Sequence, residues 1–230
     1  MDNRYFFTEK FNGKIELVGQ EAQHLIRVRR STVGDDFVAF CGDGLDYFCK
    51  IDEIKKDKVV ASIVKTQQNK AAKDCEIVVY LASLKNEALT STIDYLTELN
   101  VTTCKIFDAD RSVAKIEPKK LEKLTNISIQ ACKQCERAKV MDVEIIDKNK
   151  IKEDCKNFNN VFFAYEDAKN KIDQFRGKFA VIIGPEGGFS ESEVEYFSSF
   201  ATTISLGSTI LRAVLAGPVA VGMLKAVQNV

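Results

Sequence analysis

The most informative segment of the chain is a glycine-rich loop between an apolar strand and a helix. Val181-Ile182-Ile183 leads into Gly184-Pro185-Glu186-Gly187-Gly188, and Ser190 with Glu193 forms a capping box that opens the helix. Glycines let the backbone take a positive φ and let a ligand approach the bare chain. The loop lacks the Gly-Lys-Ser/Thr ending of a phosphate loop and the spacing of a dinucleotide fingerprint. The alternative is a tight strand-to-helix turn with a cap, but such a turn would need fewer glycines. The segment therefore indicates a ligand-binding loop, and phosphate is not the ligand that it favours.

A second loop of the same kind follows the last predicted strand. That strand ends in Leu206-Gly207, and small residues lead through Ile210 and Leu211 to Arg212 at the start of a helix. Ligands of open α/β sheets lie beyond the carboxyl ends of the strands. Two such loops at neighbouring strands could therefore form one pocket from backbone amides and carbonyls. Taken alone, Arg212 is better interpreted as a helix-start arginine in a salt bridge.

Charge limits the ways in which this chain could bind a nucleic acid. It has 33 Lys and Arg against 33 Asp and Glu, so its formal net charge is zero and bulk electrostatics would not hold it on a polyanion. Any such contact requires local basic clusters. The strongest cluster lies near the N-terminus and consists of His24, Arg27, Arg29 and Arg30. We expect this cluster to contact RNA together with Lys85 and Arg137. A solvated charged face is the alternative for each of them.

The seven cysteines are scattered without the spacing of a metal site. The pair in Cys132-Lys133-Gln134-Cys135 has no second cysteine pair to complete it, and the single histidine is distant, so we expect no metal. We interpret the cysteines as reduced core residues in a reducing compartment. No apolar run reaches the roughly 20 residues of a membrane span, and the N-terminus lacks a signal peptide. We therefore expect a cytoplasmic protein with no membrane contact.

Two patterns of secondary structure divide the chain. Short β-rich runs separated by Gly-Asp turns predict a small antiparallel barrel over residues 1–70, and polar residues 67–73 predict a linker. Strands and helices then alternate over residues 74–230, which predicts a mostly parallel α/β sheet. The predicted strands are 75–81, 101–107, 143–146, 161–165, 179–183 and 203–206, and the predicted helices are 88–99, one from 119, 191–200 and one at the C-terminus. Gly217-Pro218 predicts that the last helix begins near Pro218 or bends there.

Several segments together resemble the SPOUT, or α/β-knot, RNA methyltransferases, and most closely their ribosomal small-subunit methyltransferase E branch, the 16S rRNA uridine-N3 methyltransferases. The two glycine loops, GPEGGFSESE and LGSTILRA, resemble the C-terminal signatures of that family. Further segments agree in the same order: NRYFF, HLIRVRR, TVGDDFVAFCGDG, DYLTELNV, DADRSV and ACKQCERAKV. One departure is clear, because Val214 and Leu215 stand where the family pattern has Glu and Thr.

The resemblance implies an α/β fold with two domains that assembles as a homodimer. Residues 1–70 would form a PUA-like β-barrel that binds RNA, and residues 74–230 a methyltransferase domain tied in a trefoil knot. It also implies S-adenosylmethionine (SAM) as the cofactor, held against the backbone of the two glycine loops. By motif match, the implied cofactor-binding residues are Gly184, Glu186, Gly187, Gly188, Leu206, Gly207, Ile210, Leu211 and Arg212. Tyr165, at the end of another strand, would belong to a third wall of the site.

The resemblance further implies methylation of N3 of a uridine in small-subunit ribosomal RNA, which requires the loss of the N3 proton. Our hypothesis is that Arg111 stabilises the uracil anion and that Asp110 or Glu186 handles the proton. A surface ion pair between Asp110 and Arg111 is the alternative. Two other functions stay open: an RNA-binding or ribosome-assembly protein that has lost catalysis, as Val214 and Leu215 could indicate, and a SPOUT methylase that acts on another RNA.

Overall fold

The computed structural model describes residues 3–73, 75–170 and 172–229 and divides into two compact units. The first comprises Met1–Asp74 with Ile129–Val140, and the second Cys75–Ser128 with Met141–Val230. Residue 74, the predicted start of the second domain, lies outside the described residues. Ile129–Val140 belongs to the first unit rather than the expected second, because Cys132 and Ala138 are buried in one cluster with Phe40.

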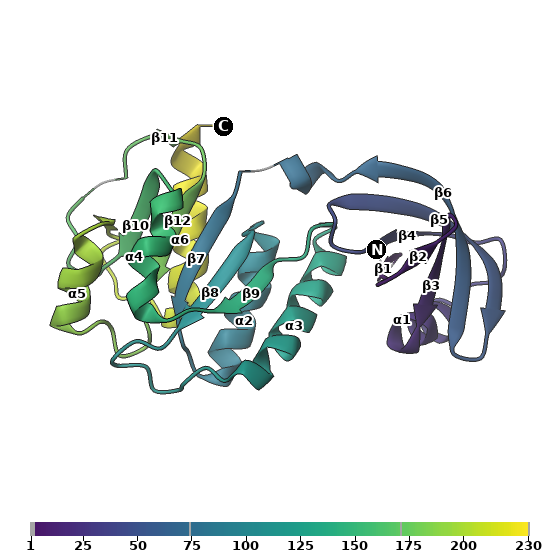
Figure 1. Cartoon of the computed structure of the whole chain (residues 1–230), viewed down its shortest axis with the longest axis horizontal. Coiled ribbons are helices and arrows are strands. Elements are labelled where there is room, and N and C mark those ends of the chain that lie inside the picture. The colour runs from purple at the N-terminus through teal and green to yellow at the C-terminus, as the bar shows by residue number, and fades with distance from the viewer. Residues whose placement is uncertain (1–2, 74, 171, 230) are drawn as a thin grey trace. The chain divides into compact units, whose positions relative to one another are not determined.

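The first unit is built on a six-stranded sheet in the order β1-β4-β5-β6-β3-β2 (Figure 1). The strands are β1 (Arg4–Phe6), β2 (Lys10–Phe11), β3 (Lys14–Val18), β4 (Asp36–Phe40), β5 (Leu45–Lys55) and β6 (Lys58–Gln68). All neighbours are antiparallel except β1 and β4, which pair in parallel, so the sheet is not wholly antiparallel as predicted. Alternate side chains such as Ile15, Leu17 and Tyr47 fill its core.

The predicted linker at 67–73 is wrong. Strand β6 continues to Gln68, and Lys70–Lys73 forms a 3₁₀ helix, η2. The buried side chain of Asn69 fixes the path between them, because its Nδ2 donates to Asp46 Oδ2 at 2.8 Å and to the carbonyl of Glu136 at 2.9 Å. Polar composition alone does not distinguish such an anchored segment from a free one.

The second unit is organised around a six-stranded sheet in the order β13-β10-β12-β7-β8-β9, in which every neighbouring pair is parallel. Its strands are β7 (Ile77–Ala82), β8 (Thr103–Phe107), β9 (Asp142–Ile145), β10 (Asn160–Ala164), β12 (Phe179–Ile183) and β13 (Thr202–Ile204). A two-stranded sheet pairs β11 (Phe175–Arg176) with β14 (Gln228–Asn229). All six predicted strands and the parallel α/β sheet are thereby confirmed.

Helices cover both faces of this sheet, giving three layers (Figure 1). Ile77, Val79 and Leu81 of β7 point into a core shared with α2 (Asn86–Glu98), α3 (Leu121–Gln134) and α6 (Ala213–Val227). The alternate residues Val78 and Tyr80 pack on the other face with α4 (Ile151–Asp154) and α5 (Glu191–Ser198). The remaining short helices are α1 (Gly19–Gln23), the π-helix η1 (His24–Val28) and the 3₁₀ helices η3 (Pro118–Lys120), η4 (Lys148–Lys150) and η5 (Cys155–Asn157).

Helix α6 starts earlier than the helix start that the Gly217-Pro218 pair predicts. It begins at Ala213, and the carbonyl of Arg212 accepts the amide protons of Leu215 at 2.8 Å and Ala216 at 3.1 Å. Pro218 lies inside the helix and lacks the N–H that would bond the preceding turn. The first turn is closed without it, so the proline does not set the helix start. In the part of the chain that the structure describes, no helix is long and apolar enough to cross a membrane.

Candidate functional site

A cavity of about 590 Å³ lies in the second unit, where three neighbouring parallel strands end. Its walls come from residues 164–166 at the end of β10, 183–186 with 188 and 189 at the end of β12, and 206–214 after β13, with Ala88 of α2 and Ala216 of α6. These strands are adjacent in the order β13-β10-β12, so their carboxyl ends meet at one edge of the sheet. This is the usual place for a ligand in an open α/β sheet, and the predicted pocket is present there.

The first glycine loop needs glycine for two different physical reasons. A Cβ on Gly184 would lie 2.7 Å from Cε2 of the Phe189 ring, so any larger residue collides with that ring. Gly188 has φ +68°, a conformation that side chains disfavour, and its amide donates to the carbonyl of Pro185 at 3.0 Å. The predicted capping box is confirmed, because Ser190 and Glu193 exchange side-chain to backbone hydrogen bonds.

The second loop is also shaped by a glycine. Gly207 has φ +128°, and the Ser205 hydroxyl donates to its carbonyl at 3.1 Å. Ile210 is 86% exposed although it lines the cavity. The Arg212 side chain is exposed and forms no ion pair with any residue in the described ranges, so the salt-bridge interpretation of Arg212 does not apply.

Tyr165 forms the third wall of the cavity. Its ring is parallel to that of Phe163, with centroids 5.8 Å apart, and its amide donates to the carbonyl of Ile204 at 3.0 Å. The Tyr165 hydroxyl donates to Asp167 Oδ2 at 3.0 Å, and this bond raises the pKa of the tyrosine. Tyr165 thus presents an aromatic surface at the strand end.

Three charged side chains line the otherwise largely apolar cavity: Glu166, Glu186 and Arg212. Glu186 is oriented by the start of α2, because its Oε1 accepts the backbone N–H of Lys85 at 3.1 Å. The cavity can therefore receive a ligand that carries both positive and negative groups beside an apolar ring.

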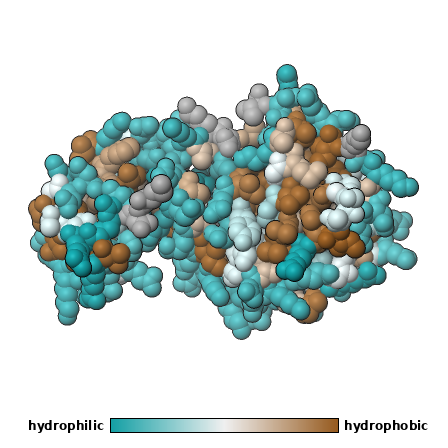
Figure 2. Space-filling view, turned by 180° about the vertical axis from the view of Figure 1, so that it is seen from behind, coloured by the Kyte–Doolittle hydropathy of each residue, from teal (hydrophilic) through white to brown (hydrophobic). Residues whose placement is uncertain are grey.

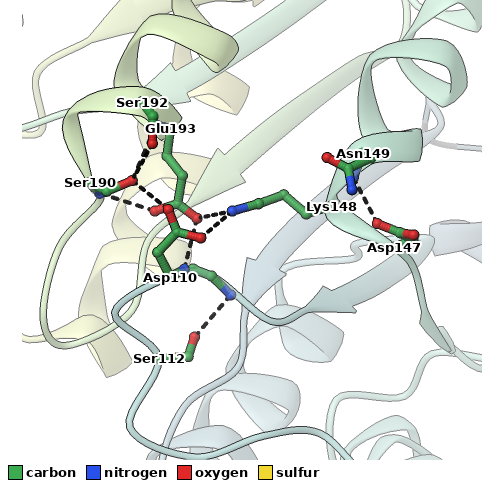
Figure 3. A network of polar contacts seen from close by, with 9 residues as sticks. Asp110, Ser112, Asp147, Lys148, Asn149, Ser190, Ser192 and Glu193 are labelled. Atoms are coloured by element: carbon green, nitrogen blue, oxygen red, sulfur yellow. Dashed lines mark hydrogen bonds and ion pairs between the residues drawn. The ribbon is translucent and has the colours of Figure 1, made fainter.

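Beside the cavity, four side chains form a network that we call the Lys148 cluster: Asp110, Lys148, Ser190 and Glu193 (Figure 3). The Lys148 ammonium donates to Asp110 and, at 2.9 Å, to Glu193 Oε1. The Ser190 hydroxyl donates to Asp110 Oδ2 at 2.6 Å. Hydrogen bonds from Lys148 and Ser190 hold the pKa of Asp110 below its usual value. Burial lowers the pKa of Lys148, but its bonds to the two carboxylates outweigh burial and raise it overall.

Arg111 lies directly against the first glycine loop. A Cβ on Gly187 would be 3.0 Å from the Arg111 carbonyl oxygen and 3.1 Å from its Cβ, so glycine permits the close approach. The Arg111 side chain is exposed, and no hydrogen bond or ion pair joins its guanidinium to any residue that the structure describes. It is adjacent to the cavity without lining it. The alternative interpretation, an ion pair between Asp110 and Arg111, is not formed among these residues, although the charge of Arg111 contributes to the lowered pKa of Asp110.

The structure brings most of the predicted cofactor residues together. All of them except Gly187 line the cavity: Tyr165, Gly184, Glu186, Gly188, Leu206, Gly207, Ile210, Leu211 and Arg212. Asp110 lies outside the lining, in the Lys148 cluster. Sequence reasoning missed Phe189, although its place after Gly188 was a possible signal, and it missed Ala88 and Lys148, for which no local pattern exists.

The predicted RNA-binding residues lie in both units. His24 starts the π-helix η1, and its Nδ1 is 3.2 Å from the Tyr5 hydroxyl. Arg27 is exposed within η1, and Arg29 and Arg30 are exposed directly after this helix. Arg30 has φ +57°, an uncommon conformation for a residue with a side chain. Lys85 is exposed in the second unit. Arg137 is only 2% exposed, so burial removes it from the surface that RNA could reach, and we withdraw it from the RNA-binding set.

None of the seven cysteines forms a disulfide bond, and Cys132 is buried in the first unit's small cluster with Phe40. Within the described ranges, no group of three or more His, Cys, Asp or Glu is placed to hold a metal ion.

Comparison with known proteins places this geometry in a family. The family model for an RNA methyltransferase domain matches residues 71–225, and the model for an RNA methyltransferase PUA domain matches residues 17–64. The ribosomal RNA small subunit methyltransferase E of Bacillus subtilis is 30% identical over 85% of this chain and 83% of its own length. Its namesake from Rickettsia conorii is 30% identical over 97% of this chain and 95% of its own.

A solved structure extends the agreement to three dimensions. A Legionella pneumophila protein assigned as a methyltransferase, with its cofactor SAM bound, superposes with a TM-score of 0.87 at 25% identity, covering 99% of this chain and 98% of that one. The predicted fold class, an α/β SPOUT domain with an N-terminal PUA-like domain, is confirmed, whereas the trefoil knot stays a prediction. The chain belongs to the ribosomal RNA small-subunit methyltransferase E family of RNA methyltransferases.

Proposed function

We propose that this protein transfers a methyl group from SAM to N3 of a uridine in small-subunit ribosomal RNA. The observation that carries the proposal is the cavity at the ends of β10, β12 and β13, which is lined by loop backbone and has both glycine loops in its walls. Membership of a family whose named relatives methylate small-subunit ribosomal RNA supports the same reaction. When bound, SAM supplies a methyl group already activated by its sulfonium.

The residues present fit SAM. The Tyr165 ring and the apolar side chains Leu206 and Ile210 offer surfaces for its adenine, and Arg212 offers a cation for its carboxylate. Glu166 and Glu186 carry the negative charge that suits its ammonium and sulfonium groups. The positive-φ glycines leave room for close approach to the backbone. The cavity is intact although Val214 lines it in place of the family's Glu, which favours an active enzyme over a silent RNA-binding protein.

The protein must also make a uracil nitrogen nucleophilic. The neutral N3–H imide is a poor nucleophile, and the anion that follows proton loss spreads its charge onto the two carbonyl oxygens. A guanidinium near those oxygens stabilises the anion. Arg111 is suited to that role, because its backbone lies against Gly187 of the first glycine loop, which we call the cofactor loop. Its guanidinium forms no hydrogen bond or ion pair with any of the described residues.

The two carboxylates considered as acceptors of the N3 proton, Glu186 and Asp110, differ in their contacts. Glu186 lines the cavity and has one oxygen bonded to the Lys85 amide, which leaves the other available. Both oxygens of Asp110 are engaged, by Lys148 and Ser190, and a carboxylate with a lowered pKa is a weaker base. We therefore assign the proton to Glu186 and a positioning role to Asp110.

RNA recognition and assembly complete the proposal. The exposed arginines that follow η1 suit phosphate contacts, and a π-helix is frequent at functional sites. Leu215 is 44% exposed, and hydrophobic side chains gather on the face of the second unit shown in Figure 2. Such a surface fits a homodimer, which sedimentation velocity would test. A ribosomal RNA substrate favours a cytoplasmic location.

The test of the proposed chemistry is Arg111→Ala, with Arg176→Ala as a control at another exposed arginine. Single-turnover methyl transfer to small ribosomal subunits should slow by about 100-fold, the effect of losing one oxyanion donor, while binding of S-adenosylhomocysteine stays the same. An unchanged rate in Arg111→Ala would remove Arg111 from the mechanism. Loss of cofactor binding in that variant would assign it a structural role instead.

A further inference from the structure

The Lys148 cluster joins three segments that are distant in the sequence (Figure 3). Asp110 lies in the loop after β8, Lys148 begins the 3₁₀ helix η4 after β9, and Ser190 and Glu193 open α5 after the first glycine loop. None of the four lines the cavity. The cluster is therefore placed to act on the site only by fixing the segments that do form it.

Glu193 is the buried centre of the cluster. Its side chain is 2% exposed, against 22% for Lys148. Its Oε1 accepts the Asp110 amide and the Lys148 ammonium, both at 2.9 Å, and its Oε2 accepts the Ser190 amide at 3.0 Å. A buried carboxylate requires such partners, and Lys148 is its only positive one among the described residues.

The cluster holds Asp110 through three hydrogen bonds, one to its backbone and two to its carboxylate. The Asp110 backbone is bound to Glu193, and its carboxylate is bound to Lys148 and Ser190. The next residue, Arg111, lies against Gly187, where an added Cβ would be 3.0 Å from the Arg111 carbonyl oxygen. The loop that carries Arg111 is thus fixed to the cofactor loop on one side and to the start of α5 on the other.

We propose that Lys148 is a positioning residue for methyl transfer: by joining Asp110 to Glu193, it keeps Arg111 in place beside the cofactor loop. This inference rests on the proposed function. Lys148 does not line the cavity, and its hydrogen bonds go to Asp110 and Glu193 and not to Arg111, so it acts through the loop and not on the reacting atoms. A displacement of about 1 Å in a positioned group can cost about 100-fold in rate, so the anchor matters for the chemical step.

Lys148 should affect the chemical step far more than cofactor binding. The capping box between Ser190 and Glu193 is formed without Lys148, and Gly184 and Phe189 shape the cofactor loop independently of it. Replacement of Lys148 would therefore leave that loop folded. It would remove one of the hydrogen bonds that hold Asp110, keep those to Glu193 and from Ser190, and so loosen the segment that carries Arg111. The signature of positioning is a fall in kcat with little change in cofactor affinity.

The experiment compares Lys148→Met with Lys148→Arg, and uses Lys150→Met as the matched control in the same 3₁₀ helix, where the side chain is exposed. We measure single-turnover methyl transfer to small ribosomal subunits, the Kd of S-adenosylhomocysteine, and hydrogen exchange of residues 108–113. Lys148→Met should lower the rate about 10- to 100-fold, keep the Kd within about threefold and speed exchange in 108–113. Lys148→Arg should recover most of the rate, and Lys150→Met should match the wild type.

The other possible results distinguish failure of the positioning role from failure of the proposed function. A wild-type rate or wild-type exchange in Lys148→Met would overturn the positioning role while the proposed function stands. Parallel loss of rate and cofactor binding, without recovery in Lys148→Arg, would reduce Lys148 to general stability. An inactive wild type that binds S-adenosylhomocysteine would refute the proposed function, and with it any role of Lys148 in methyl transfer.

A second variant covers the case in which Lys148→Met does not fold. Asp110→Asn keeps the backbone bond to Glu193 and removes the carboxylate that Lys148 holds. It should lower the rate by a similar factor, with the thermal unfolding temperature recorded beside it. A wild-type rate in folded Asp110→Asn would likewise overturn the proposal.

Discussion

Gly184→Ala is the substitution whose effect the structure defines most sharply. The backbone of Gly184 is not in a left-handed conformation, so alanine meets no backbone strain there. The new methyl group would instead lie 2.7, 3.0 and 3.2 Å from three carbon atoms of the Phe189 ring. That ring cannot move freely, because it packs edge-on against Phe163 and Phe197 with centroids 5.0 and 5.3 Å away.

The magnitude follows from the cost of overpacking. Adding a methyl group to a packed site costs about 1–3 kcal/mol. The free protein can relieve the collision by shifting the loop, and cofactor binding must then restore it. We expect S-adenosylhomocysteine to bind about 5- to 150-fold more weakly to Gly184→Ala, the equivalent of that cost in affinity. Any part of the cost that does not appear in the affinity should appear as a lower thermal unfolding temperature.

A double-mutant cycle with Phe189→Leu tests the cause. Leucine removes the ring atoms with which the methyl group collides, so Gly184→Ala should cost less than about 0.5 kcal/mol in that background. Gly188→Ala is the matched control, because no atom lies within 4 Å of its added Cβ and its cost arises from φ +68°. That cost, about 1–2 kcal/mol, should be the same with Phe or Leu at 189. Calorimetric titration measures all six proteins. Equal costs of Gly184→Ala in both backgrounds would refute the steric argument.

Two further predictions concern RNA and pH. The double variant Arg29→Ala/Arg30→Ala should weaken RNA binding. It should also reduce the slope of log K against log salt by about 0.7 for each phosphate that the protein no longer neutralises. An unchanged slope in filter-binding titrations would contradict phosphate contacts by these two arginines. Because the folded-state pKa of Asp110 is depressed, its carboxylate stabilises the fold above the unfolded pKa of about 3.9 and loses this effect as pH falls through the folded value. The difference in unfolding temperature between wild type and Asp110→Asn should therefore shrink below about pH 4, and a pH-independent difference would contradict the assignment.

The sequence predicts those parts of the site that depend on neighbouring residues. Strand β12, its glycine loop and the capping box of α5 are contiguous, so local patterns suffice to find them. The predicted pocket residues lie in two such segments and at the end of β10. Parallel strands place their carboxyl ends together, which is why loops far apart in the chain form one cavity.

The remaining features depend on tertiary contacts that no local pattern records. Lys148 lies in a polar stretch and gains significance only because the fold places it between Asp110 and Glu193. Asn69 resembles a linker residue until its partners Asp46 and Glu136 are known. Arg137 resembles an exposed cation, yet packing buries it. In each case, tertiary structure determines the role of a polar side chain whose type alone is ambiguous.

The most direct test of the proposed function is methyl transfer from labelled SAM to small ribosomal subunits that lack this modification, followed by mass spectrometry of the nucleosides. The proposed reaction predicts 3-methyluridine in the product, formed by the wild type and reduced about 100-fold in Arg111→Ala. A different methylated nucleoside would contradict the assigned substrate atom. Absence of transfer by a protein that still binds the subunit would contradict catalysis itself.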